Sequence, residues 1–321
     1  MMFGAWGDND LDACCRMLDR AVDLGINFVD TADVYAAGGS EEMLGRAMVR
    51  HRDDLVIATK FFHPMGVGVN QRGTSRRWIR QAVEGSLSRL GTDRIDLYQV
   101  HSFDTTGDVA ELIDALDDLV REGKVLYVGT SNWPAHEIVG AQWIAAQRGA
   151  RRFVCEQAHY SLLSRRIETD VLPVAKRHAL GIAVWSPLAG GLLSGGASTA
   201  GSSAPSHRER LRADRGETPL DPQHIKVRTA RLLADLARIH DVHPAHLAVA
   251  FVLNHPAVTT AVIGPRTLGH LESIVEAADL HLSADLLDAI DRIVPPGTSA
   301  DPHEVAADEA AGLACSRRRR L

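Results

Sequence analysis

The chain has 321 residues, of which 45% are hydrophobic and 24% charged, proportions typical of a soluble globular protein with one large core. Its formal net charge of −6 and its pI near 6.2 argue against a general nucleic-acid-binding protein and against a protein of the membrane surface. No apolar run approaches the ~20 residues that a membrane-spanning helix needs, and the first residues lack the basic and apolar segments of a signal peptide.

Short β-branched runs alternate with longer amphipathic segments along the chain. This alternation is typical of repeated strand–helix units that build a parallel sheet. The predicted strands are Ile26–Asp30, Leu55–Lys60, Ile95–His101, Val125–Thr130, Phe153–Glu156, Gly181–Ser186 and Val258–Gly264. The clearest predicted helices are Asp10–Leu24, Ser75–Leu90, Asp108–Arg121 and Ala135–Arg148.

Eight strand–helix units of this kind close into a (β/α)8 barrel, the TIM barrel of the α/β class, with the active site at the carboxyl ends of the strands. Seven strands are predicted here, and an eighth has room only within Met1–Trp6. An open, doubly wound sheet is the competing architecture. It is disfavoured because no predicted strand is followed by Gly-x-Gly-x-x-Gly, the turn that holds a dinucleotide in that fold. We therefore expect one barrel domain over residues 1–294.

Two segments interrupt the alternation. Residues 189–222 are rich in Gly, Ser, Ala, Arg and Pro and predict a long surface loop, and loops of that length are usually functional lids or disordered. Residues 295–321 predict an unstructured tail that ends with the arginine run Arg317–Arg320. Such a run can form a nucleic-acid or targeting patch, but on an acidic chain we expect a solvated tail.

The four cysteines are Cys14, Cys15, Cys155 and Cys315, and they show neither CxxC spacing nor a disulfide framework. Cys14 and Cys15 are adjacent in a predicted helix and point in different directions, so we expect them only to pack. Reduced thiols are typical of the cytoplasm, which we therefore expect to be the location of the protein.

Ionisable side chains close three successive predicted strands. The first of these strands ends at Asp30, and Tyr35 follows it by about one turn. The next two strands end at Lys60 and His101. Because burying ionisable groups in a core is costly, strand ends that carry them usually face a site. The carboxyl ends of barrel strands meet at one mouth, where we expect these side chains to converge.

These residue types suit proton transfer to a carbonyl oxygen. A free tyrosine has a pKa of about 10 and donates a proton poorly at neutral pH. The ammonium of Lys60, held by Asp30, is expected to lower the pKa of Tyr35 by favouring its phenolate form. His101 is expected to hydrogen-bond and orient the substrate oxygen. We therefore predict that Tyr35 is a general acid for a carbonyl group that receives hydride at carbon.

The chain resembles the aldo-keto reductase superfamily over nearly its whole length. The segment Asp30–Tyr35 has the family pattern Asp-Thr-Ala-x-x-Tyr, and the lysine and histidine that close the next two strands complete the family's catalytic tetrad. The resemblance thus implies catalytic roles for Asp30, Tyr35, Lys60 and His101. Further segments that agree with the family are Leu90–Tyr98, Gly123–Asn132 and Trp185–Leu192.

The resemblance also implies a nicotinamide cofactor at the barrel mouth. Ser131, Asn132 and Gln157 would hold its carboxamide, and Asp30 counts among the cofactor-binding residues as well. Trp185 would stack on the nicotinamide ring, although a tryptophan at a strand end can also be a simple core residue. Small side chains there would let backbone N–H groups approach the pyrophosphate. The residues placed along the pyrophosphate are Ser186, Pro187, Leu188 and Gly190.

The last predicted strand leads into Gly264, Arg266 and Thr267, and then into a helix. A glycine turn beside a helix N-terminus forms an anion site, and Arg266 would bind a 2′-phosphate, which favours NADPH over NADH. Further along, the sequence departs from the family, with His270 in place of the usual Gln and Ile274 in place of the usual Asn. Both positions normally contact adenine, so we expect a weaker adenine contact, with His270 still near the cofactor.

The beginning of the chain also departs from the family. Members normally carry an N-terminal hairpin below the barrel and a complete first strand that ends in Gly-Thr. This chain starts at about the end of that strand, so the first strand and the hairpin look truncated. A missing strand would expose unpaired edges on its two neighbours. We expect a natural start upstream of Met1, and a destabilised protein is the alternative.

Two other functions remain open. A redox-sensing or regulatory subunit of the potassium-channel β type would bind NADPH and turn over slowly, but such proteins often carry Asn in place of His101. A metal-dependent barrel hydrolase would use Asp30, His101 and Asp104. It would also want a His-x-His pair, which the chain lacks, so we expect no metal site.

Loops at the strand ends determine substrate choice in this fold. The loop Phe61–Arg72, with Phe62, His63 and Met65, is expected to line the substrate pocket together with Phe103. These side chains favour an apolar or aromatic carbonyl compound as the small-molecule partner, and we expect neither nucleic acid nor membrane as a partner.

Overall fold

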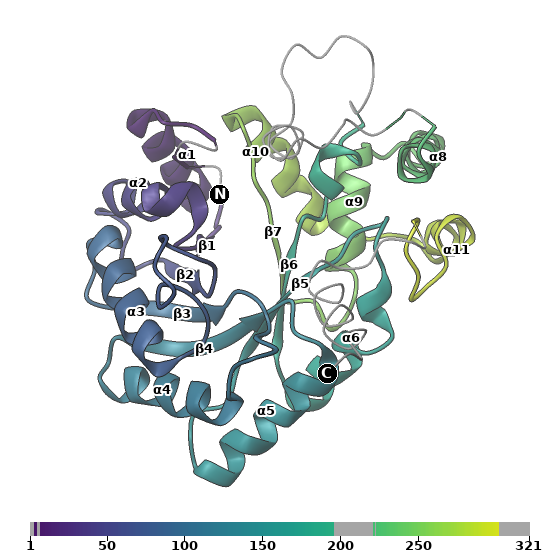
Figure 1. Ribbon diagram of the computed structural model, residues 1–321. Coiled ribbons are helices and arrows are strands. Elements are labelled where there is room, and N and C mark those ends of the chain that lie inside the picture. Colours follow the sequence, from purple (N-terminus) through teal and green to yellow (C-terminus); the bar gives the residue numbers. More distant parts are fainter. Residues whose placement is uncertain (1–2, 5–6, 196–220, 222, 302–321) are drawn as a thin grey trace.

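The computed structural model describes residues 3–4, 7–195, 221 and 223–301. Within these residues, seven strands form one parallel sheet in which the spatial order of the strands follows their order along the chain. The strands are β1 (Phe28–Asp30), β2 (Val56–Phe61), β3 (Ile95–Val100), β4 (Val125–Ser131), β5 (Cys155–His159), β6 (Gly181–Trp185) and β7 (Thr260–Val262). The sheet curls into a nearly closed barrel, as Figure 1 shows.

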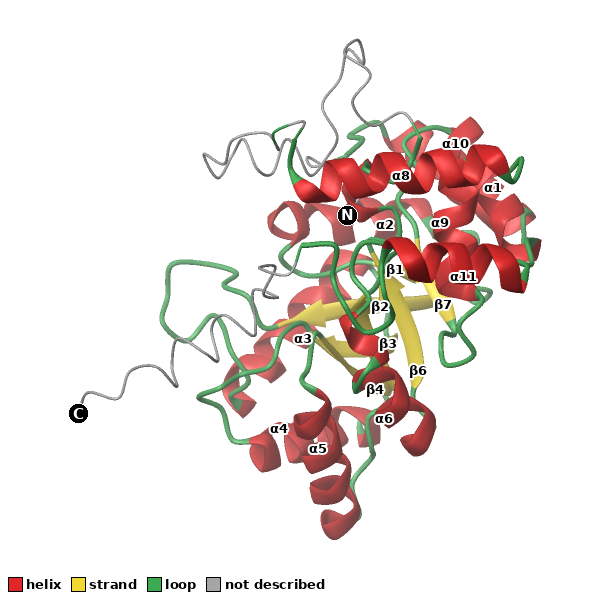
Figure 2. Cartoon of the chain, turned by 90° about the vertical axis from the view of Figure 1, so that its right-hand side faces the viewer, coloured by secondary structure: helices red, strands yellow, loops and turns green. Residues whose placement is uncertain are grey.

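Helices alternate with the strands and surround them in both views (Figure 1, Figure 2). The α-helices are α1 (Leu11–Asp23), α2 (Gly39–Ala47), α3 (Arg76–Leu90), α4 (Val109–Arg121), α5 (Ala135–Arg148), α6 (Val171–His178), α8 (Ile225–Ile239), α9 (Pro244–Leu253), α10 (Leu268–Val275) and α11 (Ala284–Ile293). Short 3₁₀ helices are η1 (Tyr35–Gly38), η2 (Arg166–Glu168), η3 (Ala189–Gly191) and η4 (Glu276–Asp279). The prediction of a (β/α)8 barrel of the TIM type is confirmed by this arrangement.

The first and last strands are joined through helices. In the described residues β1 pairs only with β2 and β7 only with β6. On this side α1 contacts α10, and Nε of Arg20 forms an ion pair with Glu272 at 2.8 Å. Of the segment Met1–Trp6, the one place with room for an eighth strand, only Phe3 and Gly4 are described, and Phe3 forms an isolated parallel bridge with Asp8.

Local sequence signals explain the helix ends. In α3 the side chain of Ser75 accepts a hydrogen bond from the backbone N–H of Trp78, and Gly91 ends the helix in the left-handed conformation at φ +61°. Asp10 and Asp108 cap α1 and α4 in the same way. The predicted helices therefore agree with the structure to within one residue at each end.

One strand lies later in the chain than expected. The predicted strand Phe153–Glu156 is β5, Cys155–His159, because the parallel register with β6 runs from Cys155 opposite Gly181 to His159 opposite Trp185. Phe153 lies before the strand and packs instead in the core against Trp133, with ring centroids 5.6 Å apart. Glu156, Gln157 and His159 obscured the strand in the sequence, because they interrupt the apolar run expected of a buried strand.

Most of the predicted loop and tail lies outside the described residues. The chain is described through Gly195 after β6, and residues 196–220 and 222 are outside. The backbone of residues 295–301 bonds to the barrel, since Arg165 N–H donates to Thr298 O at 2.8 Å and Ala300 N–H donates to Leu163 O at 2.9 Å. Residues 302–321, with Cys315 and the arginine run, are outside the described part.

The described cysteines are unpaired, with Cys14 buried and Cys15 and Cys155 partly buried. None of the helices in the described part of the chain is long and apolar enough to cross a membrane.

Candidate active site

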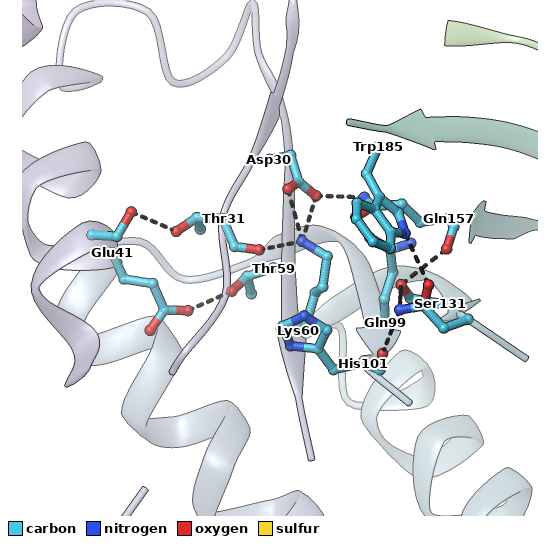
Figure 3. A network of polar contacts seen from close by, with 12 residues as sticks. Asp30, Thr31, Glu41, Thr59, Lys60, Gln99, His101, Ser131, Gln157 and Trp185 are labelled. Carbon is cyan, nitrogen blue, oxygen red and sulfur yellow. Dashed lines mark hydrogen bonds and ion pairs between the residues drawn. The ribbon is translucent and has the colours of Figure 1, made fainter. Parts of the chain in front are cut away.

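A buried ion pair lies where β1 and β2 end. Asp30 is the last residue of β1, and Lys60 in β2 is fully buried. The ammonium of Lys60 donates to both carboxylate oxygens of Asp30 at 2.7 Å and to the carbonyl oxygen of Thr31 at 2.8 Å (Figure 3). Burial opposes the charge of Lys60, but Asp30 and Tyr35 outweigh it and raise the pKa of Lys60 above its ordinary value. Lys60 is therefore a permanently charged group at the barrel mouth.

Tyr35 begins η1 beside this pair. Its ring centroid lies 5.1 Å from Nζ of Lys60 and 5.6 Å from the ring of His101, in an edge-to-face arrangement. Burial raises the pKa of Tyr35, and Asp30 adds to this, so the lowering by Lys60 does not prevail. Lys60 does lower the pKa of Tyr35, as expected, but burial outweighs this effect, so the net pKa lies above its ordinary value and not below it. The phenol keeps its proton at neutral pH, which is the form that a proton donor needs.

The turn after Tyr35 holds the phenol at the strand end. Ala36 and Ala37 have φ of 51° and 52°, in the left-handed region that non-glycine residues rarely adopt. Such residues cluster at functional sites because the surrounding structure must hold them in place.

His101 directly follows β3, and its backbone N–H donates to the carbonyl oxygen of Phe61 at 2.9 Å. Burial, with Lys60 and His63 nearby, holds the pKa of His101 well below its ordinary range, so the imidazole is neutral. Nδ1 of His101 is buried and has no hydrogen-bond partner among the described residues. The ring of His63 lies 4.7 Å away, centroid to centroid. A neutral imidazole with a ring nitrogen not used by the protein suits hydrogen bonding to a bound oxygen.

The residues assigned to the carboxamide lie next to this group. Ser131, the last residue of β4, donates through Oγ to the carbonyl oxygen of Gln157 at 3.0 Å. Asn132 donates through Nδ2 to the carbonyl oxygen of His101 at 3.3 Å. The amide of Gln157 also donates to Oδ1 of Asp30 at 2.7 Å. Asp30 therefore connects the residues predicted for catalysis with those predicted for cofactor binding (Figure 3).

Trp185, at the end of β6, is held from two sides. Its indole N–H donates to Oδ1 of Asn132 at 2.8 Å. The ring of His159 stacks on it, with centroids 4.3 Å apart and planes tilted by 20°. His159 was not predicted from the sequence, where its only signal is its position two residues after Gln157 at a strand end.

A tight turn follows Trp185. Ser186 has φ of 59°, and its hydroxyl oxygen accepts a hydrogen bond from the backbone N–H of Gly190 at 3.2 Å. Leu188 precedes η3 and packs partly buried against the hydrophobic core. Pro187 lies between them, so the predicted pyrophosphate residues form one compact turn at the strand end.

The residues predicted for the 2′-phosphate form a second group, after β7. Thr267 caps α10, and its hydroxyl oxygen accepts a hydrogen bond from the backbone N–H of His270 at 3.2 Å. Arg266 lines a cavity of about 200 Å³ together with Phe3, Cys14 and other residues of the amino-terminal segment. Gly264 and the other residues of this group are not part of the network in Figure 3.

The two departures from the family differ in their surroundings. His270 is exposed at the first turn of α10. Ile274, one turn later, is only 8% exposed and packs in a hydrophobic cluster with Val249 and Ala277. An apolar side chain at position 274 is therefore explained by core packing between α9, α10 and η4. No group of three or more His, Cys, Asp or Glu in the described residues is placed to hold a metal ion.

Comparisons with known proteins agree with this geometry. Residues 1–295 match a family model described as the aldo/keto reductase family. The "Uncharacterized oxidoreductase YrpG" of Bacillus subtilis is 38% identical over 311 residues, covering 92% of this chain and 91% of the relative. Norsolorinic acid reductase of Aspergillus flavus is 32% identical over 300 residues, covering 91% and 74%. The "Putative voltage-gated potassium channel subunit beta" of Schizosaccharomyces pombe is 32% identical over 299 residues, covering 89% and 85%.

Proposed function

The chain belongs to the aldo/keto reductase family, and from this we propose that it reduces an aldehyde or ketone to an alcohol with NADPH, using Tyr35 as the general acid. Oxidoreductases among its relatives support carbonyl reduction in general. The finer assignment rests on one observation, the fully buried Lys60 that is hydrogen-bonded to Asp30 beside the phenol of Tyr35.

Each residue of this group has a task in the proposed reaction. Tyr35 gives its proton to the carbonyl oxygen as that oxygen gains negative charge. The ammonium of Lys60 stabilises the phenolate that remains, and Asp30 keeps the ammonium in place. Neutral His101 orients the carbonyl oxygen through a ring nitrogen. Phe62 and His63, whose rings lie 5.2 Å apart on the loop after β2, suit an apolar or aromatic carbonyl compound.

The residues present fit a nicotinamide dinucleotide. Trp185 offers a planar aromatic face that Asn132 and His159 hold in place, which suits ring stacking. Arg266 directly precedes Thr267, the N-cap of α10, and a guanidinium next to a helix N-terminus favours an anion such as a 2′-phosphate. When bound, the nicotinamide supplies the hydride for the carbonyl carbon. NADPH is therefore favoured over NADH.

The test is a comparison of three proteins in NADPH oxidation with nitrobenzaldehyde. We expect turnover by the wild type and a loss of about 10²- to 10⁴-fold in Tyr35→Phe, because the general acid is removed. NADPH binding by this variant should remain. Tyr127→Phe is the matched control, since Tyr127 is 58% exposed and lies in the first half of β4, four residues before Ser131. Equal turnover by all three proteins, or activity that depends on added zinc, would contradict the proposal.

A second candidate is a regulatory subunit of the potassium-channel β type, which the similarity to the Schizosaccharomyces pombe relative supports. It predicts NADPH binding with little turnover on any carbonyl compound. A wild type that binds NADPH but oxidises none of it with a panel of aldehydes and ketones would favour this candidate.

A further inference from the structure

Asp33 is a buried carboxylate in the segment between Asp30 and Tyr35 that the proposed reaction does not use. It is 0% exposed, and neither of its carboxylate oxygens accepts a hydrogen bond of good geometry from the described residues. Its backbone N–H donates to the carbonyl oxygen of Lys60 at 3.0 Å, so the Asp33 backbone lies next to the strand residue that carries the catalytic ammonium. Burying an ionisable group without partners is costly, so such a group in a native fold calls for an explanation.

The surroundings of Asp33 offer little compensation for a negative charge. Glu41 of α2 is also fully buried; it accepts a hydrogen bond from Thr59 at 2.6 Å and pairs with Nε of Arg89 at 2.7 Å. The guanidinium of Arg89 is thus already used by one carboxylate. In Figure 3, Glu41 and Thr59 lie on the side of Lys60 opposite to Trp185.

The ionisable groups coupled to Asp33 come from five elements. Glu41 of α2, Arg89 of α3 and Lys60 of β2 act on the pKa of Asp33, and Asp33 in turn acts on the pKa of Tyr35 in η1 and of Tyr98 in β3. Lys60 is already held by Asp30 and Thr31. Tyr98 is fully buried, and its hydroxyl has no hydrogen-bond partner among the described residues.

Burial, followed by the charge of Glu41, raises the pKa of Asp33 from its ordinary value of 3.8 to about 7. The Val34 N–H, Arg89 and Lys60 oppose this shift but do not cancel it. Asp33 therefore changes charge near neutral pH, whereas Lys60 stays charged and His101 stays neutral there.

We propose that Asp33 is a positioning residue that controls how readily Tyr35 gives up its proton. A negative charge at Asp33 disfavours the phenolate of Tyr35, in the same direction as Asp30 but more weakly than Asp30 or Lys60 acts on it. When Asp33 is neutral, it no longer offsets the positive charge of Lys60, which stabilises the phenolate of Tyr35. The phenol is then a better proton donor. The inference rests on the proposed role of Tyr35. It predicts that carbonyl reduction is faster below neutral pH than above it, because Asp33 is neutral at the lower pH.

The first test is the pH dependence of single-turnover carbonyl reduction. The wild type should lose rate several-fold as the pH rises through about 7, and Asp33→Asn should lack this step because the amide carries no charge. Asp117→Asn is the matched control, since Asp117 is a buried carboxylate in α4 that pairs with Arg121 away from the barrel mouth. If Asp33→Asn keeps the wild-type step, the inference is overturned.

Glu41→Gln provides a second variant, in which the change of rate with pH should occur at a different pH instead of disappearing. Without the charge of Glu41, Asp33 ionises more easily, so the step should shift to lower pH. A step that stays in place or moves to higher pH would count against the role of Asp33.

A third measurement needs neither cofactor nor turnover. The phenolate absorbance of Tyr35 is obtained as the difference between each protein and the same protein carrying Tyr35→Phe. Asp33→Asn should shift this titration to lower pH, and an unchanged titration would refute the inference. If no carbonyl compound is reduced by the wild type, the proposed function fails, while this titration still decides the inference on Asp33.

Discussion

Asp33→Asn should stabilise the protein at alkaline pH, although it removes a charged side chain from beside the active site. In the folded protein the pKa of Asp33 is about 7, because of burial and Glu41, and in the unfolded chain it returns to about its ordinary value of 3.8. Below the unfolded pKa both states hold the proton, and Asp33 adds no pH dependence. As the pH rises towards 7, the unfolded chain releases the proton of this carboxyl first, so the unfolding free energy of the wild type falls. Above pH 7 this decrease is complete.

The size of this loss follows from the shift of the pKa. A difference of about three units, at 1.36 kcal/mol per unit, corresponds to about 4 kcal/mol of unfolding free energy. This is a large part of the 5–15 kcal/mol, roughly, that stabilises a typical domain. An asparagine has nearly the same shape as a neutral aspartic acid and keeps its proton count at every pH. The variant should thus match the wild type near pH 4 and exceed it by about 4 kcal/mol near pH 8.

Urea denaturation of both proteins near pH 4 and near pH 8 measures this effect directly. The difference between variant and wild type isolates Asp33, because all other titrating groups are common to both. Asp117→Asn should be less stable than the wild type at both pH values, since Asp117 accepts a hydrogen bond from the backbone N–H of Arg151 and pairs with Arg121. A difference between Asp33→Asn and wild type that does not change with pH would refute the reasoning.

Three further changes test other parts of the site. Lys60→Met leaves Asp30 buried without its cation and should lower the unfolding free energy by about 3–5 kcal/mol in urea; a loss below about 1 kcal/mol would contradict the pairing. Arg266→Ala should raise the Kd for NADPH at least about tenfold while leaving that for NADH nearly unchanged, and equal losses would mean that Arg266 does not contact the 2′-phosphate. Phe61→Ala should cost about 3–5 kcal/mol because Phe61 is fully buried and stacks on Tyr98 at 4.8 Å, whereas Val67→Ala, at a fully exposed position of the following loop, should change stability little.

Much of the site follows from the order of strands along the chain. In a parallel barrel every strand ends on the same side, so residues that close successive strands must lie near one another. Asp30 and Lys60 meet for this reason, with an N–O distance of 2.7 Å. The same logic brings Asn132 and Trp185 together from the ends of β4 and β6.

Other features of the site depend on contacts between distant segments. Gln157 donates to Asp30 across 127 positions of sequence, a pairing that no local pattern indicates. His159 was missed because its partner, Trp185, is defined by the register of β5 with β6. The lowering of the Tyr35 pKa by Lys60 was predicted, but the net rise was not, because the sequence shows the nearby lysine and not the extent of burial.

The sequence by itself determined the alternation of strands and helices, the helix caps and the residues at the strand ends. These depend on local periodicity and on hydrogen bonds within a few residues. Only the tertiary structure decided which of these groups are paired. Asp30 and Asp33 are three residues apart and chemically identical, yet one is paired with Lys60 and the other is buried without a hydrogen-bond partner among the described residues. Their difference arises from desolvation and from charges on α2, α3 and β2, which the fold brings to them from elsewhere in the chain.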